Sequence, residues 1–87
     1  MIEQTNLIIK ELLDLKGYDL ISYYISNKDN NLLMVTGENS DEYICSLCNI
    51  RDKNLFWDIK DVSIEALKEV IDERIKRDDF ELAYIIK

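Results

Sequence analysis

The spacing of apolar residues changes along this 87-residue chain, and no other feature constrains its fold as strongly. In residues 2–16 and 64–77 the apolar side chains recur every three or four positions, which predicts two amphipathic helices. Elsewhere they are largely aromatic or β-branched and come in short blocks between Asn, Asp and Gly, a pattern typical of strands and turns. These blocks predict strands at 18–26, 32–36, 42–50, 54–60 and 80–86.

The order of these elements predicts an α+β fold. Strands that follow one another through short turns pair antiparallel, so we expect a mostly antiparallel sheet of four to five strands with both helices on one face. The strand count stays open because 54–60 also suits one helical turn. A chain of this length builds one small hydrophobic core, which predicts a single domain spanning 1–87.

The chain is acidic, with 18 acidic and 11 basic residues, no histidine and a formal net charge of −7. This charge repels a nucleic-acid backbone, whose binding requires Lys and Arg, so we expect no direct nucleic-acid binding. An acidic surface suits a basic protein partner, for example an enzyme that itself binds nucleic acid. The alternative explanation is that moderate acidity only keeps the protein in solution.

The chain lacks the sequence marks of a membrane or secreted protein. No apolar run reaches the roughly 18 residues that a membrane span requires, and Glu3 precedes any apolar block, so we expect neither a membrane partner nor a secretion signal. These features predict a cytoplasmic protein, in which both cysteines stay reduced.

Cys45-Ser-Leu-Cys48 contains both cysteines of the chain in a C-x-x-C spacing. Residues three apart on a strand point to opposite faces of the sheet, so the two thiols cannot bind one metal ion. A redox pair also needs a helix N-terminus to lower the thiol pKa, and none is expected here. We therefore predict two packing residues, with no metal site and no cofactor.

The enzyme classes that this sequence allows are few. The absence of histidine removes Ser-His and Cys-His pairs, and the chain has no glycine-rich phosphate loop.

Asp58-Ile-Lys60, with the predicted helix and strand that follow, resembles the D/E-x-K strand of the PD-(D/E)-x-K nucleases over residues 54–87. The resemblance implies a divalent metal held by two carboxylates, with Asp41, Glu42 or Glu11 as the second ligand, since strand 32–36 carries no acid. The simpler interpretation is that Asp58 and Lys60 are solvent-facing charges at the end of a strand.

A surface constellation is the other candidate site. Aromatic residues at 56 and 57 stand among acids, and more acids occupy the turns of the sheet. We expect Trp57 to fill the core and, of the adjacent Tyr23 and Tyr24, one to face solvent. The predicted partner-binding residues are Asp29, Glu38, Asp41, Glu42, Asp52, Phe56, Asp58 and Asp61.

These observations favour a small, non-enzymatic protein that binds and inhibits a basic protein such as a nuclease. In size, charge and α+β composition the chain is similar to phage-encoded inhibitors of host defence nucleases, including DNA-mimicking anti-CRISPR proteins, and to immunity proteins that block toxin nucleases. One alternative is the metal-dependent nuclease or an inactive relative. Another is an interaction domain that forms a homodimer through strand 80–86.

Overall fold

The computed structural model describes residues 2–86, with Ile2 described by its backbone alone. It contains two helices and one five-stranded antiparallel sheet, which confirms the predicted α+β class and shows that segment 54–60 is a strand. The elements are α1 (Ile2–Lys16), β1 (Asp19–Ser26), β2 (Leu32–Glu38), β3 (Tyr43–Asn49), β4 (Asn54–Asp61), α2 (Ile64–Asp78) and β5 (Phe80–Ile85).

Both helices end at a residue with left-handed backbone geometry. Gly17 follows α1 with φ 84°, a conformation that its missing Cβ permits, and the N–H of Tyr18 then donates to the carbonyl oxygen of Leu13 at 3.0 Å. Asp79 ends α2 with φ 53°, and its N–H donates to the carbonyl oxygen of Ile75. These local stops let the chain enter β1 and β5 directly after each helix.

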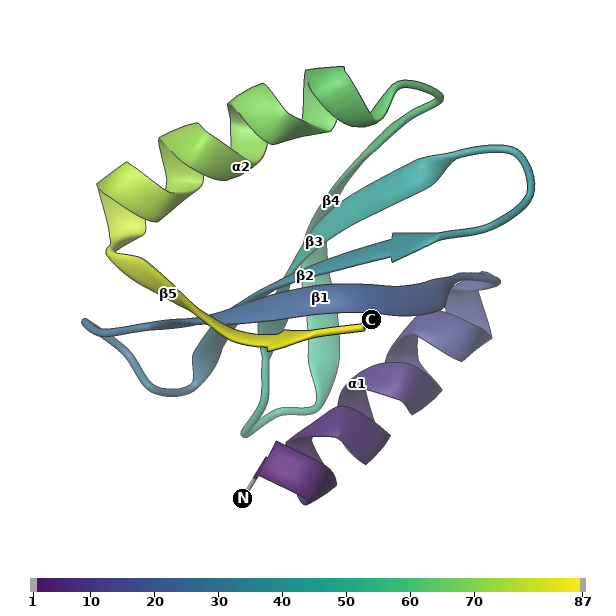
Figure 1. Ribbon diagram of the computed structural model, residues 1–87. Coiled ribbons are helices and arrows are strands. Elements are labelled where there is room, and N and C mark those ends of the chain that lie inside the picture. Colours follow the sequence, from purple (N-terminus) through teal and green to yellow (C-terminus); the bar gives the residue numbers. More distant parts are fainter. Residues whose placement is uncertain (1, 87) are drawn as a thin grey trace.

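The strand order is β4-β3-β2-β1-β5. Strands β1 to β4 form a meander, so the β2–β3 turn lies at one end of the sheet and the β1–β2 and β3–β4 turns lie at the other. Helix α2 then carries the chain from β4 at one edge of the sheet to β5 at the opposite edge (Figure 1).

The two helices lie on opposite faces of the sheet, so the prediction that both cover one face is wrong (Figure 1). Consecutive residues of β2 show the division, because Leu33 and Val35 pack on the side of α1 whereas Met34 packs on the side of α2. A strand covered on both faces is apolar at consecutive positions, as β2 and β3 are.

The hydrophobic core is accordingly divided into two layers, contrary to the single core that we expected. The layer under α1 is built from Ile9, Leu13, Tyr18, Leu20, Tyr23, Leu33, Val35, Ile44 and Cys48. The layer under α2 is built from Met34, Cys45, Leu47, Leu67, Ile71 and Phe80.

Because helices cover both faces of the sheet, the positions of the aromatic residues differ in part from those predicted. Tyr23 is fully buried and stacks on Tyr84 with ring centroids 5.6 Å apart, while Tyr24 is half-buried against the other layer. Neither tyrosine faces open solvent, so that prediction is wrong. Trp57 is partly buried and packs against the α2 layer rather than filling the core, with the guanidinium of Arg74 4.6 Å from its ring centroid.

Candidate partner-binding site

The two cysteines lie in different layers of the core. Cys45 packs in the layer under α2 and Cys48 in the layer under α1, which confirms that the C-x-x-C spacing points the thiols to opposite faces of β3. Burial raises the pKa of each thiol to about 11, so both are protonated at neutral pH. The arrangement is that of two small apolar side chains in a core.

Asp58 and Lys60, the pair that resembles a nuclease strand, are engaged with residues at the end of α1. Lys16 donates a hydrogen bond to Asp58 at 2.7 Å, and this contact lowers the pKa of the Asp58 carboxyl. The Nζ atom of Lys60 lies 5.7 Å from the ring centroid of Tyr18. Within residues 2–86 no group of three acidic or cysteine side chains is placed to hold a metal ion, so the nuclease interpretation gains no support from this site.

Tyr18 connects the β2–β3 turn to the end of α1. Its buried ring lies in the core under α1, and its hydroxyl donates a hydrogen bond to the carboxylate of Glu42. Burial, and after it the Glu42 carboxylate, raises the pKa of Tyr18 to about 12. Asn39 adds a second connection, because its side-chain amide donates to the carbonyl oxygen of Gly17 at 3.3 Å.

The predicted partner-binding residues do not form one surface. Asp29 and Asp52 belong to the turns at one end of the sheet, whereas four other acids lie at the opposite end, near the β2–β3 turn. Phe56 is 53% exposed and lies at an irregularity of the edge strand β4. The acids brought together at the β2–β3 end are Glu38, Asp41, Glu42 and Asp61.

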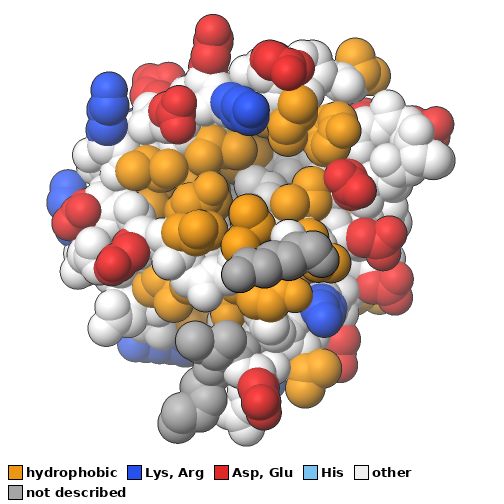
Figure 2. Space-filling view, in the orientation of Figure 1, with side chains coloured by type: hydrophobic (Ala, Val, Ile, Leu, Met, Phe, Trp, Pro, Cys, Tyr) orange, Lys and Arg blue, Asp and Glu red, His pale blue; other side chains and the backbone are white. Residues whose placement is uncertain are grey.

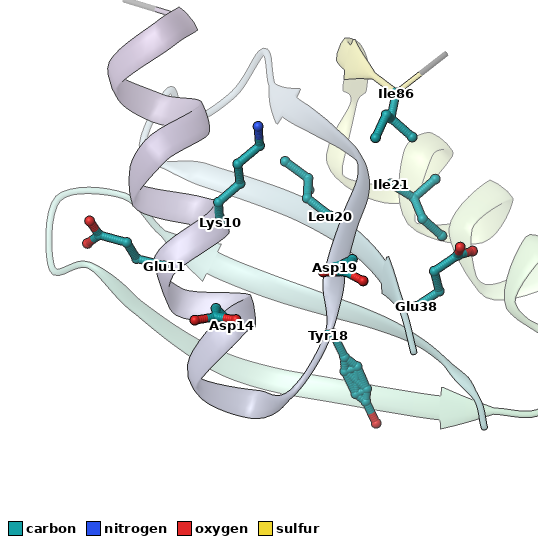
Figure 3. Close-up of a pocket in the computed structure, with 9 residues that line it drawn as sticks. All are labelled: Lys10, Glu11, Asp14, Tyr18, Asp19, Leu20, Ile21, Glu38 and Ile86. Atoms are coloured by element: carbon teal, nitrogen blue, oxygen red, sulfur yellow. The ribbon is translucent and has the colours of Figure 1, made fainter. Parts of the chain in front are cut away.

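A groove of about 640 Å³ lies beside this acidic end, between α1 and the start of β1 (Figure 3). We call it the acidic groove, because four of its nine lining residues are acidic and one is basic. Apolar side chains of Leu20, Ile21 and Ile86 contribute to its wall. The full lining is Lys10, Glu11, Asp14, Tyr18, Asp19, Leu20, Ile21, Glu38 and Ile86.

The groove carboxylates form no ion pair with the described residues, and Lys10 is the one basic residue of the lining. Asp19 and Glu38 are directly opposite each other in the pairing of β1 with β2, an arrangement of like charges that costs stability. The two ion pairs among residues 2–86, Lys16 with Asp58 and Arg74 with Asp78, involve none of the groove acids. Figure 2 shows acidic side chains along the margin where α1 ends and the β2–β3 turn lies.

Only part of the groove was predicted from the sequence. Glu38 was among the predicted partner-binding residues, and Glu11 was considered only as a metal ligand. Asp14 and Asp19 were missed, although each stands next to the helix end that Gly17 marks. Their position beside Gly17 could have indicated that they lie close together, because a helix that folds back on the following strand brings both residues to one end of the molecule.

No helix among residues 2–86 is long and apolar enough to cross a membrane, and the cytoplasmic location stays a prediction. Comparisons of the chain with protein families, with curated proteins and with solved structures found no match in any of the three.

Proposed function

We propose that this chain is a small acidic protein that binds a basic protein through the acidic groove and inhibits it. The proposal rests on the four groove carboxylates, which belong to Glu11, Asp14, Asp19 and Glu38. These four residues contribute to the lining of a partly apolar groove, and within residues 2–86 none of them has a hydrogen-bond or ion-pair partner through its side chain. Asp19 and Glu38 are like charges directly opposite each other, which reduces stability, and an acidic groove suits a cationic ligand.

The chemistry of the groove matches Lys and Arg side chains. Their aliphatic stems pack on apolar surface, such as that of Ile21 and Ile86, while their charged heads reach a carboxylate rim. In a nuclease the same Lys and Arg residues bind the phosphates of the substrate. A protein that occupies them with carboxylates excludes the substrate, and inhibition follows without a catalytic step.

The experiment compares two variants that carry the same loss of charge. In the groove variant Asp14→Asn, Asp19→Asn and Glu38→Gln remove three rim charges. In the control variant Glu69→Gln, Asp72→Asn and Glu73→Gln remove three charges from the outer face of α2. Each protein is immobilised and exposed to a lysate of the organism that encodes it, and the captured protein is identified, purified and tested for activity.

We expect a captured protein of basic charge whose affinity for the wild type falls as NaCl rises from about 50 mM to about 300 mM. Rim charges of this exposed kind contribute about 0.2–1 kcal/mol each, so the loss of three of them is expected to weaken binding of the groove variant roughly 3–150-fold, and the control variant is expected to bind close to wild type. An acidic partner, an affinity independent of salt, or equal effects of the two variants would contradict the proposal.

A further inference from the structure

Strand β5 leaves one side of its backbone open. It is the last strand beyond β1 in the sheet order, and within residues 2–86 no strand lies outside it. The N–H of Ile86 donates to the carbonyl oxygen of Ile21 on the β1 side at 2.8 Å. Amide directions alternate along a strand, so the N–H of the preceding residue, Ile85, points away from the sheet. An open edge of this kind is a template for another strand.

The two sides of this edge differ in chemistry. Leu82 pairs with Tyr24 and Ile85 with Ser22, and cross-strand partners share a face, so both apolar side chains lie on the side of α2. They are 49% and 50% exposed. Ile86 points to the side of α1, where it borders the acidic groove. The edge is therefore apolar on the side of α2, and on the side of α1 it borders Glu11 and Asp14 of the acidic groove.

The face of the molecule that carries β5 has the composition of an interface. In Figure 1 strand β5 runs across the front, and in the same orientation Figure 2 shows hydrophobic side chains gathered in the middle of the view with charged side chains around them. Exposed apolar residues from this part of the chain include Leu82, Ile85 and Ile86. An apolar centre with a polar rim is typical of a protein-binding surface.

We infer that an extended segment of the basic partner adds to the sheet along β5 as a sixth strand. Because side chains of a strand alternate between its faces, such a segment carries apolar residues at every second position, next to Leu82 and Ile85, and Lys or Arg between them, over the acidic groove. This inference rests on the proposed function and adds the position and the sequence pattern of the bound segment. Charge decides against a second copy, which has a net charge of −7 and brings its own carboxylates.

The test uses a capped peptide of alternating Lys and Val, about eight residues long, which matches the length of one strand. A peptide of alternating Glu and Val is the charge control. Binding to the full-length protein is followed by the chemical shifts of its backbone amides and by hydrogen exchange. We expect the Lys-Val peptide to shift amides of β5 and to slow the exchange of the Ile85 amide, and the Glu-Val peptide to do neither.

Two variants with the same added charge locate the binding edge. Leu82→Lys places a cation on β5, whereas Phe56→Lys places one at an exposed apolar position of β4, the opposite edge. Both sites are about half exposed, so the fold tolerates the change. We expect Leu82→Lys to weaken binding of the Lys-Val peptide about fivefold and Phe56→Lys to leave it within about twofold.

Several results would overturn the inference. Peptide effects confined to the groove, equal effects of the two variants, or equal protection of the Ile85 amide by the Glu-Val peptide would each exclude strand addition by a basic segment. Protection of that amide without peptide, together with a dimer in sedimentation, would assign the edge to a second copy. None of these results decides the proposed function, because that proposal is tested by the groove variant and by the charge of the captured partner.

Discussion

Replacement of Gly37 by alanine tests whether the sheet is packed against α1 as the structure describes. Gly37 is a buried residue of β2, and it does not share the positive φ of Gly17. A Cβ atom at this position would lie 2.9 Å from the carbonyl oxygen of Asp19, and 3.3 Å from side-chain atoms of both Leu13 and Ile44. The closest of these atoms belongs to the backbone of β1 and cannot move aside by a side-chain rotation.

The expected cost follows from two opposing effects. Overpacking of a closed core costs about 1–3 kcal/mol. Alanine also restricts the unfolded chain, which returns about 0.4–1 kcal/mol at a position whose backbone it can adopt. We therefore expect Gly37→Ala to lower the free energy of unfolding by about 1–2 kcal/mol, a large share of the roughly 5–15 kcal/mol typical of a domain.

Urea unfolding followed by the fluorescence of Trp57 measures this change, because Trp57 is the one tryptophan of the chain and packs against the α2 layer. Gly17 supplies the control, since a Cβ there meets nothing within 4 Å and only its φ of 84° matters. Gly17→Asn should cost little, because asparagine tolerates this backbone region, whereas Gly37→Asn should cost more than Gly37→Ala. If Gly37→Ala were as stable as the wild type, the close approach of α1, β1 and β3 at this point would be wrong.

Tyr18→Phe should lower the free energy of unfolding at neutral pH by about 1–2 kcal/mol, because a hydrogen bond to a carboxylate is lost. The pKa of Tyr18 is about 12 in the folded state and about 10 in the unfolded chain, so the free energy of unfolding of the wild type should fall as the pH rises from about 10 toward 12. It should fall less in the variant, and urea titrations across this pH range will test the difference. Lys16→Met should return the lowered pKa of Asp58 toward its ordinary value in a carbon-13 NMR titration. The stability change should stay below about 1 kcal/mol, since both side chains of this pair are about a third exposed, and a larger loss would contradict the surface character of the pair. Cys45 and Cys48 have pKa values of about 11, so in the folded protein both thiols should resist a thiol reagent at about pH 8 and should react once urea unfolds the chain. Fast labelling of the native state would contradict their burial.

The sequence by itself determined which segments become helices and strands. The period of the apolar residues is a local property, and both helices begin at the predicted residue, with α1 also ending at Lys16 and α2 one residue later than expected. Gly17 marks the end of the first helix because glycine, which has no Cβ, readily adopts the positive φ that is required there. The opposite directions of Cys45 and Cys48 also followed from the chain, because side chains alternate along any strand.

Two further features of the fold are indicated by the sequence. Successive turns of a meander lie at alternate ends of the sheet, so Asp29 and Asp52 had to lie away from Glu38 and Asp41. The continuous apolar runs of β2 and β3 likewise indicated a sheet covered on both faces. Both signals are present in the sequence.

Only the tertiary structure decided on which face each helix lies and which acids meet. A periodic pattern tells how wide the apolar side of a helix is, but the face that it covers depends on the path of the chain between elements. Helix α1 folds back beside β1, which places Asp14 near Asp19, and the pairing of β1 with β2 adds Glu38. Residues far apart in the sequence thus form the acidic groove, because their proximity depends on packing and strand register, which no local pattern specifies.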